Sequence, residues 1–186
     1  MSDPTAAAAG AAADVSPDGR VVAPALVRRL AAFLYESVLL FGVLFTLNLV
    51  YFGFTHQSDP SLTHAPLMGL SFLVLGAYFI YFWTHGGQTL AQKTWHLRVV
   101  TDVGQPLPPR RALMRYIASW VWVLPPFVLI VALGLPKSRG LYFGAPLVWI
   151  VGYAASSLLH PRRQFWHDAL CGTAIGNKQP TAPLPQ

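Results

Sequence analysis

The sequence predicts an all-α membrane protein with four transmembrane helices and a small cytoplasmic surface hairpin between helices 2 and 3. Three observations predict this fold class. Hydrophobic residues make up 54% of the 186 residues and charged residues only 11%, whereas an average soluble domain carries roughly 25% charge. The apolar residues are grouped into four long stretches, and the Lys and Arg residues lie mostly on one side of them. This composition excludes a soluble enzyme and a chain that is disordered throughout.

Four apolar stretches of 18 to 23 residues are long enough to cross a bilayer. As helices they extend roughly 27–35 Å, and the hydrocarbon core of a bilayer is about 30 Å thick. Buried helices of a soluble protein are the alternative, but four such segments leave too little polar sequence to cover them. The predicted spans are residues 30–52, 66–83, 116–135 and 141–159.

Two short segments flank the predicted transmembrane domain of residues 25–176. Residues 1–24 are rich in alanine, and no basic residue precedes their weakly apolar run, so they do not fit a secretory signal. Residues 177–186 are polar and rich in proline. We predict that both segments are disordered tails.

The connector of residues 84–115 predicts the surface hairpin. Gly86-Gly87 ends the second span, and residues 95–100 alternate in a strand-like manner. Residues 101–104 predict a turn. Residues 105–107 predict a short return strand, which the prolines around it prevent from extending.

The positions of the basic residues orient the spans. Of the thirteen Lys and Arg residues, all but Lys137 and Arg139 precede the first span, join the second to the third, or follow the fourth. Because basic loops stay in the cytoplasm, both termini are predicted to be cytoplasmic, in a plasma membrane such as the bacterial inner membrane. The net charge of +6 then serves orientation and contact with anionic headgroups of the lipid bilayer, and no nucleic-acid partner is predicted.

Glu36 is the most informative residue of the spans. It follows Arg29 by seven residues, which is roughly 10 Å along a helix. The two side chains differ by about 20° around the helix axis, so they share one face. An ionisable group within a span is costly and marks a candidate functional site. Two interpretations stay open: a structural ion pair with Arg29, or a carboxylate that binds a cation or carries a proton.

A second polar cluster follows the fourth span. His160, His167 and Asp168 match no common zinc spacing, and Cys171 is the one cysteine of the chain. We therefore predict no metal site and no cofactor.

His167 and Asp168 are expected to form hydrogen bonds at the inner membrane surface and to contact Arg29 or Arg115 from the same side. The serines and the cysteine have no base at a recognised spacing, so no catalytic residues and no enzymatic activity are predicted.

Short motifs follow one another in a fixed order along residues 28–177. They are Arg28–Phe33 at the start of the first span, Gly87–Leu90 with Lys93, Leu97–Val100 before Gly104, Arg115 at the third span, and His167-Asp168 followed by Gly172-Thr173. In this order and spacing the chain resembles the RDD family of membrane proteins.

The resemblance assigns counterparts to the arginine and the two aspartates for which the family is named. Arg29 matches the arginine and Asp168 the second aspartate. Glu36 replaces the first aspartate, which keeps the charge and adds one methylene. The resemblance implies a role in transport, since some members are linked to cation/proton antiport.

Two functional hypotheses follow. In the first, the protein transports a small cation or proton, with Glu36 as the membrane-embedded carboxylate, Arg29 modulating its charge and Asp168 at the cytoplasmic mouth. Pro125-Pro126 supports it, since a proline pair within the third span predicts a kink that frees backbone carbonyls. Secondary candidates for the site are Asn48, Arg115 and His167.

In the second hypothesis, the protein does not transport but assembles with itself or regulates another membrane protein. The small size of the chain and the few polar residues within its spans support it. Small residues such as Gly152 and Ser156 in the fourth span permit close helix contact.

Overall fold

The computed structural model describes residues 19–55, 60–136 and 138–177. The predicted tail segments 1–18 and 178–186 lie outside the described residues. In chain order the elements are α2 (Leu26–Thr55), α3 (Pro60–Thr84), α4 (Leu90–Thr94), β1 (Leu97–Thr101), α5 (Pro109–Ser119), the 3-10 turn η2 (Trp120–Trp122), α6 (Leu124–Ala132), α7 (Arg139–Ser156), the 3-10 turn η3 (Ser157–Leu159), α8 (Trp166–Leu170) and β2 (Thr173–Asn177).

Three helical segments are long and apolar enough to cross a membrane: α2, residues 64–84 of α3, and α7 with η3. Their large side chains point outward, as Phe41, Phe54 and Phe143 do with exposed fractions of 70%, 85% and 77%. Burial of so much apolar surface requires lipid or another chain around it. The apolar helices thus point to a membrane location.

The predicted third span, residues 116–135, is not one continuous helix. It is divided between α5 with η2 and α6, which meet at a bend of 53°. Pro125 and Pro126 explain the break, because they lack N–H donors and are tolerated only in the first turn of a helix, where α6 places them. The carbonyl of Val121, which a continuous helix would pair with residue 125, instead accepts a hydrogen bond from Trp149 Nε1 of α7 at 2.8 Å. The pair provides a fourth span if it crosses the membrane as one broken helix.

The strand expected after the second span is present, but its partner differs from the prediction. β1 pairs antiparallel with β2, from Leu97 opposite Asn177 to Thr101 opposite Thr173. The expected return strand at residues 105–107 is not formed. Gln105 closes a tight turn instead, where its carbonyl accepts the Thr101 N–H at 2.9 Å. The prolines beside it leave too few donors for a ladder.

Residues 20–24, which the sequence placed in the N-terminal tail, pack along this sheet. The N–H of Val21 donates to the carbonyl of Asp102 at 3.0 Å, and the N–H of Ala23 donates to that of Arg162 at 3.1 Å. They precede α2 and connect its start to both the connector and the segment before α8.

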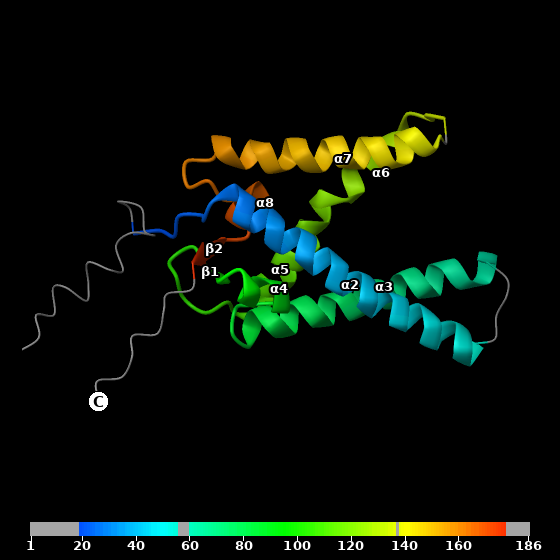
Figure 1. Cartoon of the computed structure of the whole chain (residues 1–186), viewed down its shortest axis with the longest axis horizontal. Coiled ribbons are helices and arrows are strands. Elements are labelled where there is room, and N and C mark those ends of the chain that lie inside the picture. The colour runs from blue at the N-terminus through cyan, green and yellow to red at the C-terminus, as the bar shows by residue number, and fades with distance from the viewer. Residues whose placement is uncertain (1–18, 56–59, 137, 178–186) are drawn as a thin grey trace, which may run out of the picture.

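The sheet, α4 and α8 lie together at one end of the long helices, where α2 begins and α3 and α7 end (Figure 1). The buried apolar side chains gather at this end, and they include Trp83, Leu97, Val99, Tyr116, Trp122 and Phe165. The opposite ends of α2 and α3 carry almost no buried residues. A packed layer therefore closes one end of an otherwise thin set of helices.

Gly87 fixes the approach of the connector to the sheet, which yields a first prediction. Its φ is +72°, and a Cβ at this position would lie 2.6 Å from the carbonyl oxygen of Val99. We expect Gly87→Ala to lower the free energy of unfolding by about 1–2 kcal/mol or more, because a left-handed conformation is strained for alanine and the added methyl overlaps backbone. Thermal unfolding in detergent micelles, followed by circular dichroism, measures this loss.

Gly42→Ala is the matched control, since Gly42 lies within α2 and nothing approaches its Cβ position within 4 Å. Alanine should be neutral or stabilising there. Equal unfolding temperatures for the two variants would show that the contact between Gly87 and Val99 does not constrain the fold.

Candidate functional site

The buried face of α2 carries two of the three charged residues of the helix, whereas Arg28 is only partly buried. Its buried residues are Arg29, Ala32 and Glu36, which a period of 3.6 places on one stripe. The remaining surface of the helix is mainly apolar and exposed. This is the inverse of a soluble amphipathic helix and suits a helix whose outer surface meets lipid.

Glu36 is held by two hydroxyl groups from other elements. Tyr78 of α3 donates its hydroxyl proton to Oε1 at 2.6 Å, and the Thr89 hydroxyl donates to Oε2. Thr89 is also the N-cap of α4, where it forms a capping box with Gln92. An ionised carboxylate only accepts hydrogen bonds, so both oxygens of Glu36 have a donor suited to that state.

The structural ion pair of Arg29 with Glu36, one of the two interpretations that the sequence left open, is not formed among the described residues. The guanidinium carbon of Arg29 lies 4.3 Å from the centroid of the Phe165 ring, in a cation–π contact. Its Nε and Nη1 atoms are buried and have no hydrogen-bond acceptor among the described residues. The Phe165 ring therefore holds the Arg29 guanidinium in place, and two of its buried nitrogen atoms donate no hydrogen bond.

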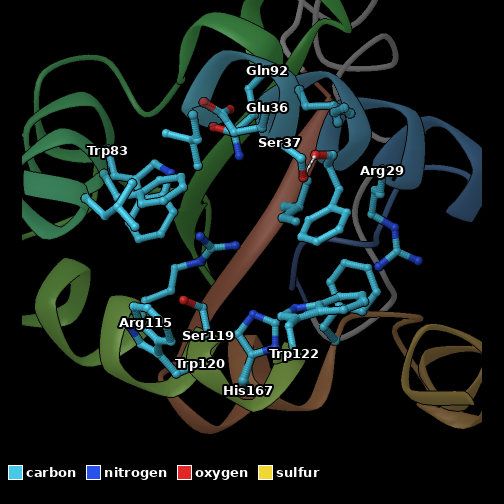
Figure 2. Close-up of a pocket in the computed structure, with 18 of the residues that line it drawn as sticks. Arg29, Glu36, Ser37, Trp83, Gln92, Arg115, Ser119, Trp120, Trp122 and His167 are labelled. Carbon is cyan, nitrogen blue, oxygen red and sulfur yellow. Dashed lines mark hydrogen bonds between the residues drawn. The ribbon is translucent and has the colours of Figure 1, made fainter. Parts of the chain in front are cut away.

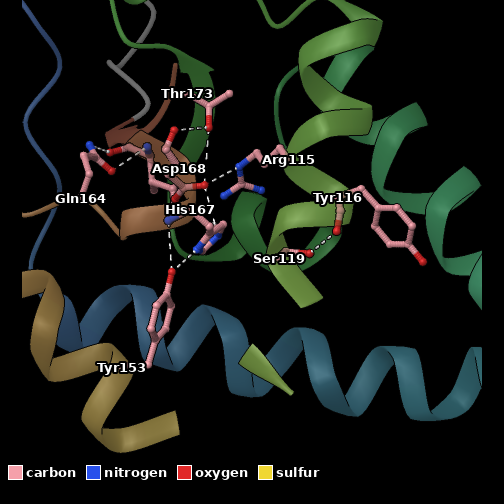
Figure 3. Close-up of polar contacts among 9 residues, drawn as sticks. Arg115, Tyr116, Ser119, Tyr153, Gln164, His167, Asp168 and Thr173 are labelled. Atoms are coloured by element: carbon pink, nitrogen blue, oxygen red, sulfur yellow. Dashed lines mark hydrogen bonds and ion pairs between the residues drawn. The ribbon is translucent and has the colours of Figure 1, made fainter. Parts of the chain in front are cut away.

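Asp168 pairs with Arg115, one of the two arginines that the sequence offered as its contacts. Arg115 Nε lies 2.8 Å from Asp168 Oδ1, and both side chains are almost fully buried (Figure 3). The Arg115 guanidinium also lies 4.2 Å from the Trp83 ring centroid. Thr173 donates its hydroxyl to the backbone carbonyl of Asp168 at 3.1 Å, which ties the start of β2 to α8.

His167 links this ion pair to α7. Tyr153 Oη lies 2.8 Å from His167 Nδ1 and accepts the backbone N–H of His167 at 3.1 Å. His167 Nε2 lies 3.3 Å from Asp168 Oδ1. Burial lowers the pKa of His167 below its ordinary value, the Asp168 carboxylate opposes this shift, and the Arg115 charge adds to it. A neutral ring that accepts at Nδ1 and donates from Nε2 to Asp168 fits these contacts.

Arg29, Glu36, Arg115 and His167 line one cavity of about 290 Å³ at the packed end of the molecule. Figure 2 shows the Arg115 guanidinium extending into its centre, with His167 and Trp122 on the side opposite Glu36. Asp168 does not line the cavity and acts on it through Arg115. Among the described residues no cluster of three His, Cys, Asp or Glu side chains is arranged to hold a metal ion.

Asn48 does not belong to this site. Its amide donates to the carbonyl of Leu44 in the preceding turn of α2 at 2.7 Å, and it does not line the cavity.

Tyr78, Thr89 and Gln164 are site residues that sequence reasoning missed. Gln164 pairs with both backbone groups of Ile175 and so fixes β2 beside α8. The spacing of Thr89 and Gln92 fits a capping box, which could have identified Thr89 from the sequence as the N-cap of a helix.

The model of the RDD family matches residues 23–172, which is most of the chain. This range contains every residue that lines the cavity except Ile175. No curated protein and no solved structure matches the chain.

The ion pair of Asp168 with Arg115 yields a second prediction. We expect Asp168→Asn to destabilise the protein by about 3 kcal/mol, because a buried guanidinium is left without its countercharge. The free energy of unfolding in detergent micelles measures the effect.

Asp102→Asn is its control, because Asp102 pairs with Arg111 at 3.8 Å on the surface, with exposed fractions of 43% for Arg111 and 25% for Asp102. Such a pair contributes about 1 kcal/mol at most. A loss for Asp168→Asn as small as that for Asp102→Asn would contradict the assignment.

The lowered pKa of His167 yields a third prediction, on pH. Unfolded His167 takes up a proton near pH 6.5, whereas the folded protein resists protonation there. The stabilising contribution is therefore complete above about pH 6.5 and is lost as the pH falls, by at most about 1.4 kcal/mol per pH unit.

The measurement compares unfolding temperatures at pH 7.5 and 5.5 for the native protein and His167→Asn, whose amide oxygen can still accept from Tyr153. The native protein should lose more stability on acidification than the variant. An equal loss in both would assign the acid sensitivity to other groups.

Proposed function

The chain belongs to the RDD family, and we propose that it is a transport protein that moves protons across the membrane with Glu36 as the proton-carrying carboxylate. The observation that carries the proposal is the position of Glu36, buried within α2 on the wall of a cavity. A carboxylate kept within a span at an energetic cost is a candidate for function. Tyr78 and Thr89 hydroxyls contact its two oxygens, and hydroxyl groups can both give and accept protons.

The charges around the cavity favour a proton over a metal cation as the species at Glu36. Arg29 and Arg115 line the same cavity, and each guanidinium repels a metal ion. Glu36 is the one carboxylate among the lining residues, whereas hard cations bind through several oxygen ligands. A proton needs only the carboxylate itself.

In this proposal Arg115, Asp168 and Arg29 do not carry the proton but set the charge around the cavity. Arg115 faces the cavity while Asp168 neutralises it from behind, so Asp168 is a positioning residue. Arg29 places a positive charge on the same buried face of α2 as Glu36.

A second candidate function is assembly, and one observation favours it. A hollow of about 1200 Å³ between α6 and α7 is lined by apolar and small side chains, which include Gly144, Gly152 and Ser156. Small residues on a helix permit close approach of another helix in lipid. In this alternative the hollow receives a helix of a second copy or of another membrane protein. Gly152→Leu would then reduce the oligomer measured by crosslinking in membranes and leave proton movement at the background rate.

Proton flux in proteoliposomes tests the first proposal. The native protein should dissipate an imposed pH gradient faster than empty liposomes, and Glu36→Gln should lower that excess rate at least tenfold. Glutamine can still accept from one hydroxyl and donate to the other, so this variant is expected to fold. The rate is followed with a pH-sensitive dye inside the vesicles, at equal protein incorporation and with Na⁺ or K⁺ gradients as separate arms.

Asn48→Leu is the matched control, because it removes a polar side chain from the same helix outside the cavity. It should keep the native rate. A native rate equal to that of empty liposomes would overturn proton movement, and a native rate in Glu36→Gln would remove Glu36 as the carrier.

A further inference from the structure

The cavity contains hydrogen-bond donors that find no acceptor among the described residues. They are Nε and Nη1 of Arg29 and the indole Nε1 of Trp83, and both residues line the cavity. Arg29 and Trp83 are each only 3% exposed. Unpaired buried donors are rare, and each costs free energy unless something accepts from it.

The carboxylate and imidazole acceptors on the cavity wall are already engaged. Both oxygens of Glu36 accept from hydroxyl groups of other elements. His167 directs Nδ1 to Tyr153 and Nε2 to Asp168. Asp168 Oδ2 is a buried acceptor without a donor, but Asp168 does not line the cavity. An acceptor supplied from outside the chain would satisfy the Arg29 donors that face the cavity.

The charge of the wall favours an anionic acceptor. Arg115 forms a direct ion pair with Asp168. Among the described residues Arg29 forms no direct ion pair, and Asp168 attracts it only at longer range. The Phe165 ring holds the Arg29 guanidinium in place by a contact with its carbon at 4.3 Å. An arginine fixed in this way loses little conformational entropy when it binds a carboxylate or phosphate.

The rest of the lining favours an apolar body on the same ligand. Phe33, Leu40, Leu75, Phe79 and Val123 all face the cavity. Its volume of about 290 Å³ is at the lower end of the range for small-molecule sites, about 300–1000 Å³. A bare inorganic ion would leave this apolar wall without contacts.

We propose that the cavity is a binding site for an organic anion, whose carboxylate or phosphate accepts hydrogen bonds from Arg29 while its apolar part packs against the phenylalanine and leucine side chains. The anion is either a free small molecule or the headgroup region of an anionic lipid. This site does not depend on proton movement by Glu36, because it rests on the unpaired donors alone.

Binding to the full chain in nanodiscs of phosphatidylcholine tests the proposal. Tryptophan fluorescence is the readout, since Trp83, Trp120 and Trp122 line the cavity. Hexanoate is titrated as the anionic probe, and 1-hexanol as a neutral probe of similar size. We expect saturable binding of hexanoate, at least tenfold weaker binding of 1-hexanol, and at least a tenfold loss of hexanoate affinity in Arg29→Gln.

Arg28→Gln is the matched control. Arg28 is the neighbouring arginine of α2, but its guanidinium donates to Asn177 and to the Trp95 carbonyl outside the cavity. Its loss should leave hexanoate affinity unchanged. Thermal unfolding verifies the fold of each variant. If Arg29→Gln does not fold, Arg29→Lys keeps the positive charge but removes the planar set of donors, and it should weaken hexanoate binding several-fold.

A second set of nanodiscs that contains phosphatidylglycerol distinguishes the two sources of the anion. A fluorescence change on adding this lipid, present in the native protein and absent in Arg29→Gln, together with weaker hexanoate binding, identifies the lipid headgroup as the occupant. Hexanoate binding that phosphatidylglycerol does not alter identifies a free organic anion. Absence of a response to both anions, or equal affinities in the native protein and Arg29→Gln, overturns the proposal.

Discussion

Burial of charge at one end of an apolar molecule is the constraint on which the rest of the structure depends. Glu36 and Asp168 are both nearly inaccessible to solvent, and an ionised group without partners in such a place would be strongly destabilising. The fold meets this constraint with donors from distant segments. α3 and the connector bring hydroxyl groups to Glu36, and α5 brings Arg115 to Asp168. The sheet, α4 and α8 hold these segments together.

The break after α5 follows from the same constraint. Arg115 contacts Asp168 from α5, while α6 leaves at a bend of 53° to pack against α7. A straight helix through residues 116–135 would direct both halves along one line, whereas the proline pair lets each half find its own partner. The Trp149 indole then satisfies the carbonyl of Val121 at the break. The bend thus separates a polar contact near the sheet from an apolar one in the helices.

Local patterns in the sequence predicted the parts of this arrangement that depend on neighbouring residues. Hydropathy located the apolar helices, and helical periodicity placed Arg29 and Glu36 on one face. The pairing of β1 with β2 could not be read in this way, because it joins the connector to the far end of the chain. For the same reason Tyr78 was not evident as the partner of Glu36. The ion-pair interpretation failed because Phe165 offers Arg29 an aromatic surface that no local pattern reveals.

The two buried charged residues of α2, Arg29 and Glu36, differ in how the protein satisfies them. Each carboxylate oxygen of Glu36 accepts a hydrogen bond from a protein hydroxyl group. Arg29 is held by the Phe165 ring, and two of its nitrogen atoms have no hydrogen-bond acceptor among the described residues. Both residues line the same cavity, so the two proposals place an anion and a proton on one wall. Thermodynamic linkage makes any coupling between two such ligands reciprocal: an anion that alters proton binding must itself bind with an affinity that depends on pH.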